Sequence, residues 1–206
     1  MARRTKEEAE QTKSAILDSA LELFYEKGFA RTTFDEIAKR INLTKGAVYW
    51  HFRNKADLLA ELMRRKFTEK DRQTWEDKPE ITTLEQLRNS FRRAAVSIET
   101  DPEFCRFLFF VIFQMEWSEI ITARVHQQIR EITDYPWFAL KERLTFIQKS
   151  GEISPDINID DLTTLLSCSW RGIVDAFIAK RFPMNLSRAL LQAFDLLMDG
   201  LKVEKR

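Results

Sequence analysis

Two short amphipathic segments, residues 33–41 and 44–52, follow one another with two residues between them. In the first, Thr33 can cap a helix whose apolar side chains recur at i, i+3, i+4 and i+7, the spacing of a helix with one buried face. Thr44 then supplies the side-chain oxygen of a second N-cap, directly before Lys45. Two short helices joined this tightly are typical of a helix-turn-helix.

The second of these helices is too aromatic on its outside for an ordinary surface. Ala47, Val48 and Phe52 are expected to face inward and hold it against the first helix. The side chains left on or near the outer face are basic, small or aromatic: Lys45, Gly46, Tyr49, Trp50 and His51. Gly46 costs about 1 kcal/mol of helix propensity relative to alanine. That cost is explained if a phosphate backbone or a neighbouring helix approaches closely there.

This outer face and the helix starts beside it are predicted to bind nucleic acid, because free backbone amides at helix starts favour anions. The candidate DNA-binding residues are Thr33, Thr44, Lys45, Gly46, Tyr49, Trp50, His51 and Lys55. Lys45 and Gly46 are expected to meet base edges, and the hydroxyl, imidazole and amino groups to position the protein on phosphates. The alternative is that Tyr49, Trp50 and His51 fill a core or a seam between domains, and Trp50 can serve both purposes.

Composition and charge favour an all-α protein with a basic end. The chain has only 5 glycines and 5 prolines in 206 residues, and no β-branched alternation indicates a sheet. Residues 1–55 hold 11 lysines and arginines against 8 acids, a net charge of +3, whereas the remainder holds 22 against 24, a net charge of −2. Arg3, Arg4 and Lys6 precede the first helix as a basic arm that can follow the DNA backbone or minor groove.

Several classes of protein are disfavoured by what the chain contains. Without a signal peptide or an apolar run of membrane-spanning length, the protein is expected in the cytoplasm, on the nucleoid when bound to DNA, with no membrane partner. Cys105 and Cys168 are isolated among apolar residues, which indicates buried free thiols rather than a disulfide, metal ligands or a redox switch. Two histidines and two such cysteines form no evident triad or metal site, so neither an enzyme nor a metal or other cofactor is expected.

Downstream of the first domain, the sequence divides into further helices. Asn54 can cap a helix from Lys55 to about residue 75. Later helices are predicted at about 84–99, 104–117, 118–149 with a break at Pro136, 160–181 and 187–202. The expected architecture has about nine helices. A helix-turn-helix domain of three helices spans residues 1–54, and a larger helical domain for ligand binding and dimerisation spans residues 55–206.

The middle of the chain carries most of the aromatic residues, and so many rings seldom pack without gaps. Ligand sites are mostly apolar cavities with a few polar groups. The candidate ligand-binding residues are Phe67, Phe91, Phe110, Phe113, Glu116, Trp117, Gln128, Trp137 and Trp170. The alternative for each ring is core filling, and for Gln128 a satisfied core amide or a surface turn. A buried Glu116 would attract cationic amphiphiles, whereas an exposed one would have no such meaning.

The last two predicted helices are apolar on more than one side, so one face can serve the core of the monomer and another a partner. We expect a two-fold dimer through a four-helix bundle, with Gly172 allowing close approach. The candidate dimerisation residues are Ile173, Phe177, Leu190, Phe194 and Leu197. The alternative is simple burial within a monomer. A symmetric dimer would place two recognition helices about one turn of DNA apart, on a near-palindromic site.

The run from Ile16 to Leu59, about the first quarter of the chain, resembles the DNA-binding domain of the TetR family of bacterial transcriptional regulators. The resemblance rests on Glu26-Lys27-Gly28-Phe29, on the Thr-Thr-Phe-Asp-Glu-Ile-Ala of residues 32–38, on the Lys-Gly-Ala-Val-Tyr-Trp-His-Phe of residues 45–52, and on Lys55. Residues 1–12 and the Tyr-Trp-His-Phe motif are most similar to the AcrR and TtgR branch, which controls multidrug efflux pumps.

The resemblance implies a homodimeric repressor whose operator contacts include all the candidate residues above except Trp50. It also implies a drug-binding pocket in the aromatic part of the chain. A ligand held between the helices that begin near residues 55, 104 and 118 would favour one position of the first of them and so change the spacing of the two DNA-binding heads. The alternatives are an architectural or division-linked DNA-binding protein controlled by a protein partner, and a helical carrier of apolar ligands.

Overall fold

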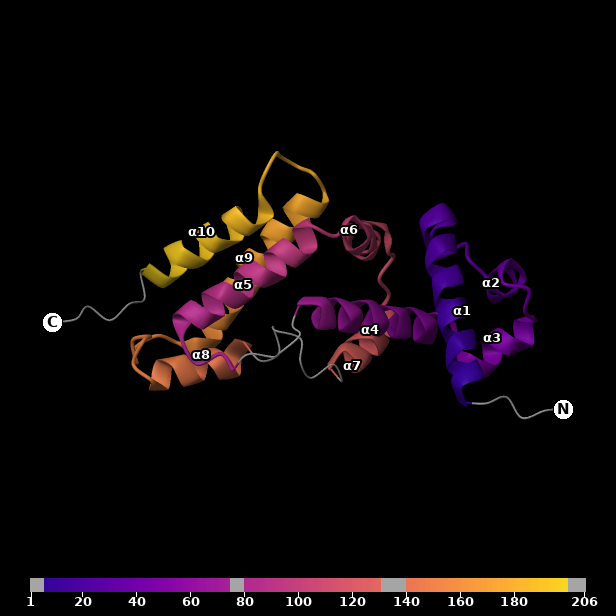
Figure 1. Ribbon diagram of the computed structural model, residues 1–206, viewed down its shortest axis with the longest axis horizontal. Helices are drawn as coiled ribbons and strands as arrows, with labels where there is room; N and C mark the ends of the chain where they lie inside the picture. Colours follow the sequence, from indigo (N-terminus) through magenta and orange to yellow (C-terminus); the bar gives the residue numbers. More distant parts are fainter. Residues whose placement is uncertain (1–5, 75–79, 131–139, 200–206) are drawn as a thin grey trace. The chain divides into compact units, whose positions relative to one another are not determined.

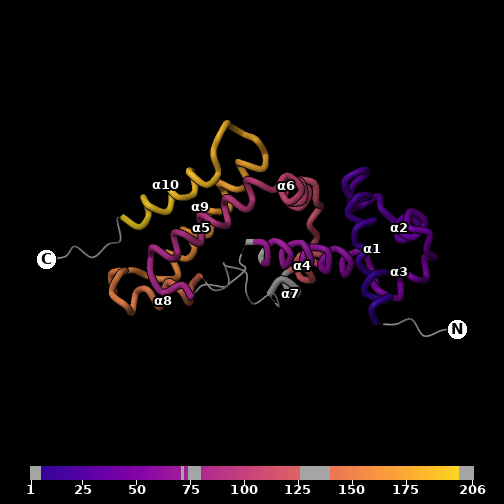
Figure 2. The backbone as a smooth tube through the Cα atoms, in the orientation of Figure 1, coloured from indigo at the N-terminus to yellow at the C-terminus, as the bar shows by residue number. Residues whose placement is uncertain are grey.

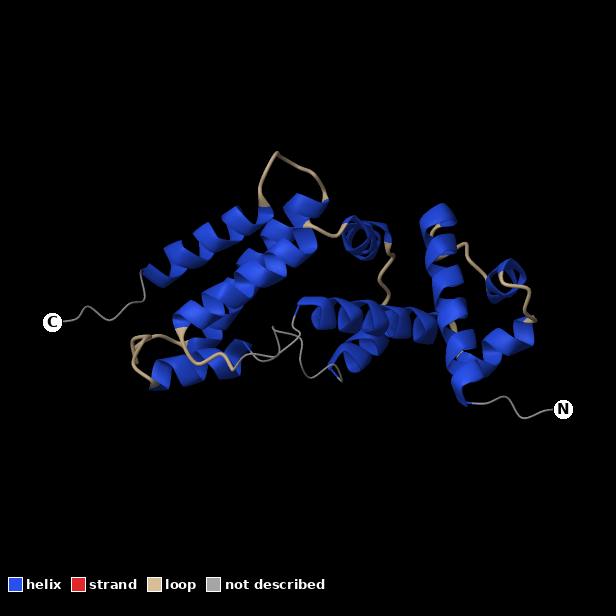
Figure 3. Cartoon of the chain, viewed as in Figure 1, coloured by secondary structure: helices blue, strands red, loops and turns tan. Residues whose placement is uncertain are grey.

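The computed structural model describes residues 6–74, 80–130 and 140–199 and contains helices and loops, with no strand in those ranges (Figure 3). The elements, labelled in Figure 1, are α1 (Lys6–Lys27), α2 (Phe34–Arg40), α3 (Lys45–His51), α4 (Lys55–Thr74), α5 (Leu84–Glu99), α6 (Pro102–Phe109), the π-helix η1 (Phe110–Gln114), α7 (Glu119–Arg130), α8 (Leu140–Lys149), α9 (Ile159–Ile178) and α10 (Leu186–Asp199). The predicted all-α class is confirmed. No helix among the described residues is long and apolar enough to cross a membrane.

The chain forms two compact units. The first contains Met1–Phe67 and Phe113–Ile132, and the second contains Thr68–Ile112 and Thr133–Arg206. The first unit therefore holds the helix-turn-helix, the beginning of α4 and helix α7. The second holds α5, α6 and α8 to α10.

Helix α1 supplies the central apolar surface of the first unit. Ile16, Leu17 and Phe24 are almost completely buried. The chain then turns at Gly28, whose φ of +85° lies in the left-handed region that favours glycine. Ser19 is buried as well, and its hydroxyl donates a hydrogen bond to the carbonyl of Ile37 in α2 at 3.1 Å. This bond satisfies a polar group in the core and fixes α2 on α1.

Helices α5, α9 and α10 lie side by side in the second unit (Figures 1 and 2). Phe91 of α5 lies at their centre, with ring centroids 5.3 Å from Trp170 of α9 and 5.2 Å from Phe194 of α10. At the surface, the guanidinium of Arg88 donates two hydrogen bonds to the carboxylate of Asp195, at 2.6 and 2.8 Å. Aromatic packing inside and a bidentate ion pair outside hold α10 against α5.

Most predicted helix ends are confirmed, with one clear correction. The helix predicted to run to about residue 117 is wrong in its second half, because the α-helix ends at Phe109 and a π-helix follows to Gln114. A π-helix shifts the backbone hydrogen bonds by one residue, and apolar periodicity does not reveal that shift. The helix predicted to reach residue 181 stops at Ile178, and Lys180 takes a φ of +51°. The predicted break at Pro136 lies outside the described residues.

Candidate nucleic-acid interface

Helix α2 begins with a complete capping box. The hydroxyl oxygen of Thr33 accepts a hydrogen bond from the backbone N–H of Glu36 at 3.3 Å, and the Glu36 carboxylate accepts one from the backbone N–H of Thr33 at 2.9 Å. The Lys27 ammonium also pairs with this carboxylate. Donation from Lys27 and then from Thr33 lowers the pKa of Glu36 to about 2. The predicted cap at Thr33 is confirmed.

The turn between α2 and α3 is as short as predicted. Asn42 adopts a φ of +55°, which asparagine tolerates better than most residues. This geometry lets the N–H of Leu43 donate to the carbonyl of Ala38 at 2.8 Å. Thr44 then caps α3, its hydroxyl accepting from the N–H of Ala47 at 3.3 Å. The two caps and the turn fix the angle at which α3 leaves α2.

The inward side of α3 is confirmed by burial. Val48 is fully buried, and Phe52, which directly follows the helix, has 4% of its surface exposed. Ala47 is half-buried beside them. These side chains hold α3 on the domain, so the rest of its surface is available to a partner.

The outward side of α3 carries large aromatic side chains in solvent. Trp50 is 74% exposed and Tyr49 is 52% exposed, so the alternative that these two rings fill a core is wrong. Tyr49 is braced by an edge contact with Phe34 at 5.0 Å between ring centroids. The Lys45 ammonium lies 5.6 Å from the centre of the Tyr49 ring. The half-buried His51 ring packs against Trp50 at 4.5 Å.

Packing against the residues that the structure describes does not require glycine at position 46. A Cβ added there would meet the Oγ1 of Thr44 at 3.8 Å, an ordinary van der Waals distance. The residue nevertheless lies in the first turn of α3, where glycine is unfavourable relative to alanine. Gly46 is exposed beside Thr44 and Lys45, which are exposed as well. The missing side chain therefore leaves room for something outside the chain.

Lys55 has a partner within the domain. Its ammonium donates hydrogen bonds to the carbonyl oxygens of Phe29 at 2.8 Å and Ala30 at 2.9 Å. It also lies 4.8 Å from the centre of the Phe29 ring. Burial lowers the pKa of this amine. Lys55 thus ties the start of α4 to the loop between α1 and α2, a role that the sequence analysis missed, and contact with phosphate stays a prediction.

The structure gives the predicted ligand-binding residues very different surroundings. Phe91 and Trp170 pack on each other in the core of the second unit, and Phe110 is fully buried. Phe113 and Trp117 are 39% and 41% exposed, and Phe67 is half-buried. Glu116 is exposed, so the interpretation that it attracts cationic ligands loses its basis. The Gln128 side chain and Trp137 lie outside what the structure describes.

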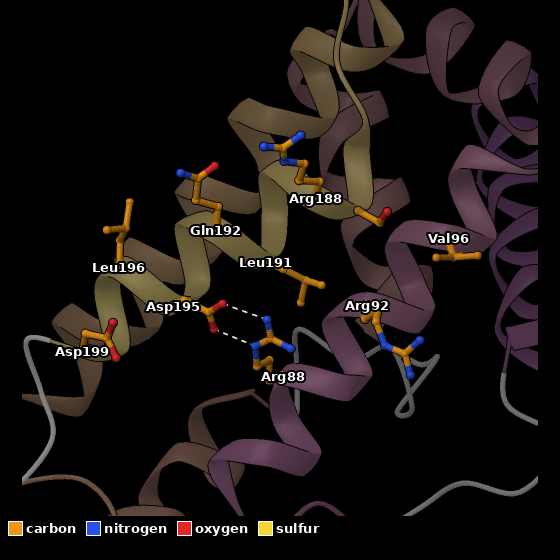
Figure 4. A pocket seen from close by; sticks show the side chains of 10 residues that line it. Arg88, Arg92, Val96, Arg188, Leu191, Gln192, Asp195, Leu196 and Asp199 are labelled. Atoms are coloured by element: carbon orange, nitrogen blue, oxygen red, sulfur yellow. Dashed lines mark hydrogen bonds and ion pairs between the residues drawn. The ribbon is translucent and has the colours of Figure 1, made fainter.

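A surface groove lies elsewhere, between α5 and α10 (Figure 4). Its volume is about 690 Å³, and the Arg88–Asp195 ion pair lies in it with the Leu191 side chain pointing toward the same space (Figure 4). Arg92 and Arg188 add further positive charge along it. None of the predicted ligand-binding residues whose side chains the structure describes lines this groove.

The predicted dimerisation residues differ in burial within the single chain, and their place in an interface stays a prediction. Leu190 and Phe194 are 2% and 3% exposed because they form the core face of α10, Phe194 packing on Phe91. Ile173, Phe177 and Leu197 are half-buried. A different set of apolar or small residues recurs at helical spacing on the two helices, and we name it the outer stripe: the exposed Leu165 and Gly172 with the half-buried Ser169 and Ala176 of α9, and the exposed Leu196 with the half-buried Ala189 and Ala193 of α10.

The outer stripe differs from the residues that sequence reasoning selected. Leu165 is 53% exposed and Leu196 is 70% exposed. A Cβ added at Gly172 would meet nothing within 4 Å. The recurrence of small residues and one leucine at i, i+4 and i+7 on each helix was a signal that could have located this stripe. The amount of apolar surface on α9 and α10 did not show which side packs on α5.

A pair of capped helices joined by a tight turn, with the second exposing basic and aromatic side chains, defines a helix-turn-helix DNA-binding domain. Residues 16–62 match the model of the N-terminal domain described as bacterial regulatory proteins, tetR family. Over residues 16–62, about a quarter of the chain, this protein is therefore similar to the DNA-binding domain of bacterial regulatory proteins of the tetR family.

Two curated proteins illustrate how the similarity is distributed. The HTH-type transcriptional regulator TtgR of Pseudomonas putida is 51% identical over 63 residues, which is 31% of this chain and 30% of that protein. This match thus spans less than a third of the relative. The probable acrEF/envCD operon repressor of Escherichia coli is 28% identical over 192 residues, covering 86% of this chain and 81% of that protein.

Solved structures share the fold over nearly the whole chain. NalD, the secondary repressor of the MexAB-OprM multidrug efflux pump in Pseudomonas aeruginosa, superposes with a TM-score of 0.74 at 23% identity, covering 97% of this chain and 100% of that one. The complex of SmeT with triclosan gives a TM-score of 0.75 at 22% identity, covering 95% of this chain and 93% of that one. SmeT is the repressor of the Stenotrophomonas maltophilia pump SmeDEF. At these identities the likeness shows the fold.

Proposed function

We propose that this protein is a transcriptional repressor that binds a near-palindromic operator as a homodimer and leaves it when a small hydrophobic ligand binds. The observation that carries this proposal is the outer face of α3. There, the missing side chain of Gly46 leaves space for a partner molecule beside the exposed Lys45, Tyr49 and Trp50. A surface of this kind fits a major groove and its phosphates. Thr33, Thr44, His51 and Lys55 complete the proposed DNA-binding set.

The outer stripe supports the homodimer. It combines two exposed leucines with small residues, and helices approach each other closely where side chains are small. Gly172 fits this role because, among the described residues, no atom lies within 4 Å of where its Cβ would be. Pairing the stripe with its copy would bury Leu165 and Leu196 and form a four-helix bundle from α9, α10 and their partners. Two recognition helices related by this symmetry would read two half-sites.

The ligand part of the proposal rests on the relatives and on the exposed aromatic residues. SmeT was solved with triclosan, and NalD and SmeT are described as repressors of multidrug efflux pumps. In this chain, Phe113, Trp117 and Ile120 are 39%, 41% and 78% exposed on and after the π-helix. A ligand lowers operator affinity only if it binds the DNA-free conformation more tightly, typically by about 1 to 3 kcal/mol.

The test is fluorescence anisotropy at fixed salt on duplexes from the DNA that flanks this protein's own gene, against a random duplex. Tyr49→Ala should weaken selective binding at least tenfold. Phe146→Ala is the matched control, because Phe146 of α8 is also 52% exposed and aromatic and should leave binding unchanged. Triclosan and a panel of hydrophobic cations should release the duplex. Equal affinity for selected and random DNA would contradict the proposal, and selective binding that no compound alters would contradict its ligand part.

A further inference from the structure

Arg124 of α7 forms an ion pair with Asp57 of α4 inside the first unit. The Nε of Arg124 lies 2.6 Å from the Oδ1 of Asp57, and the two side chains are 38% and 14% exposed. The contact joins residues 67 positions apart in the sequence. From its position we infer that Arg124 is a positioning residue for the DNA-reading helix, acting through Asp57. This inference rests on the proposed function of α3.

Asp57 lies in the first turn of α4, close to the short link that connects α4 to α3. Asn54 caps α4, its side-chain oxygen accepting a hydrogen bond from the N–H of Asp57 at 2.9 Å. Residues 52–54 alone separate the end of α3 from the start of α4. Phe52 is held in the core at 4% exposure, so this short link has little freedom. A displacement of the first turn of α4 is therefore expected to tilt α3.

The first turn of α4 is held from two directions. The Lys55 ammonium bonds the carbonyl oxygens of Phe29 and Ala30, in the loop between α1 and α2. Arg124 binds the Asp57 carboxylate from α7. The first bond relates α4 to the other helices of the DNA-binding head, whereas the second relates it to a helix outside the head. Of these two contacts, it is the Arg124–Asp57 ion pair that makes the position of α4 depend on the position of α7.

Helix α4 and the π-helix that precedes α7 are the elements through which the described chain passes between the two units. The chain leaves the first unit after Phe67, within α4, and re-enters it at Phe113, within the π-helix that precedes α7. π-helices are rare and occur often at functional sites. A rearrangement in the second unit can thus act on the first through α4 and through the π-helix that leads into α7. The Arg124–Asp57 ion pair ties α4 and α7 together next to the DNA-reading helix.

The energetic argument concerns the carboxylate of Asp57. Its side chain is largely buried, and a buried carboxylate that loses its cation is costly unless the local structure moves to hydrate it. Removal of Arg124 should therefore let the first turn of α4 shift toward water. The change is expected as local opening of α3 and α4, because the Arg124 side chain is 38% exposed and its replacement removes no apolar side chain from a core.

The experiment compares Arg124→Gln with Arg64→Gln in the full-length protein. Arg64 is the matched control because it also ion-pairs on α4, with Glu61 three residues away, at 2.7 Å. Hydrogen exchange of the amides of residues 45–60 is measured without DNA. It should quicken at least fivefold in Arg124→Gln and stay within twofold in Arg64→Gln. The urea midpoints of the two variants should agree. Arg124→Lys, which keeps the cation, should restore most of the protection.

Operator affinity gives the second readout, on the duplex selected for the wild-type protein. Arg124→Gln should bind it at least fivefold more weakly than Arg64→Gln does. The inference would be overturned if Arg124→Gln and Arg64→Gln had the same hydrogen-exchange rates and the same affinity for the duplex. If no variant binds any duplex selectively, the proposed function fails, while the exchange data still decide whether Arg124 holds α3 and α4 in place.

Discussion

Lys55 and Phe29 contact each other twice. The Lys55 ammonium donates a hydrogen bond to the Phe29 carbonyl at 2.8 Å and lies 4.8 Å from the centre of the Phe29 ring. The same amine also bonds the next carbonyl, that of Ala30. Lys55 was expected to contact DNA because it lies at a helix start. The structure shows that it also links α4 to the loop between α1 and α2. Mutating it would affect folding and DNA binding together.

We predict that Lys55→Met lowers the free energy of unfolding by about 1 to 2 kcal/mol, because two charge-assisted hydrogen bonds are lost from a half-buried site. Urea denaturation followed by circular dichroism measures the change. Lys45→Met is the control, since Lys45 is exposed on α3, and it should change stability by less than about 0.5 kcal/mol. Equal stability of the two variants would show that the Lys55 bonds contribute nothing.

Gly46→Ala should separate folding from DNA binding. The added methyl group meets no atom closer than 3.8 Å, and alanine favours a helix by at most about 1 kcal/mol over glycine. The variant is therefore expected to be as stable as the wild type or more so, yet to bind its selected duplex at least tenfold more weakly. Thermal unfolding and anisotropy on one sample check both halves. Unchanged affinity would mean that DNA does not approach Gly46.

Trp50 and Phe52 should respond in opposite ways to truncation. Trp50 is 74% exposed, so Trp50→Ala should change stability by less than about 0.5 kcal/mol while weakening DNA binding. Phe52 is 4% exposed, and Phe52→Ala should cost about 3 to 5 kcal/mol of stability. Chemical denaturation and anisotropy of both variants give the comparison. A large loss of stability in Trp50→Ala would place its ring in an interface between parts of this chain.

Acid should weaken the start of α2 through Glu36. Hydrogen bonds from Lys27 and Thr33 lower the pKa of this carboxyl from 4.5 to about 2 in the folded protein. The folded state thus binds fewer protons than the unfolded state between those values, and its stability from this group falls as the pH drops from 4.5 toward 2. The stability difference between wild type and Glu36→Gln should shrink across that range. A carboxyl pKa near 4.5 by NMR would refute this account.

Leu196→Glu should convert a dimer to a monomer, because a carboxylate would replace the most exposed apolar side chain of the outer stripe. Phe182→Glu is the control. Phe182 is also a large exposed apolar residue, at 57% against 70% for Leu196, but lies between α9 and α10. Light scattering coupled to gel filtration measures the mass of each variant. A dimer that survives Leu196→Glu would exclude the outer stripe as its interface.

Local signals in the sequence located most of the DNA-binding domain. Side-chain caps at Thr33, Thr44 and Asn54 all occur in the structure. The inward side of α3 was predicted correctly at Val48 and Phe52. These features depend on residues three or four positions apart. For that reason, periodicity and capping patterns were sufficient to find them.

Contacts between distant residues were not predictable in this way. Lys55 and Phe29 are 26 residues apart, Arg124 and Asp57 are 67 apart, and Arg88 and Asp195 are 107 apart. The sequence shows that each residue is charged or polar but not which partner it meets. Phe194 was assigned to a dimer interface for a related reason, since α10 is apolar on two sides and only packing on α5 decides between them.

The separation of buried and exposed side chains on α3 has a consequence for how this protein can change over time. A helix of seven residues is too short to be stable alone, so the surrounding domain supplies its stability through Val48 and Phe52. The residues that face outward contribute little to that stability. Substitutions at Lys45, Tyr49 and Trp50 can therefore accumulate without unfolding the protein, and a new DNA sequence preference can arise on an unchanged scaffold.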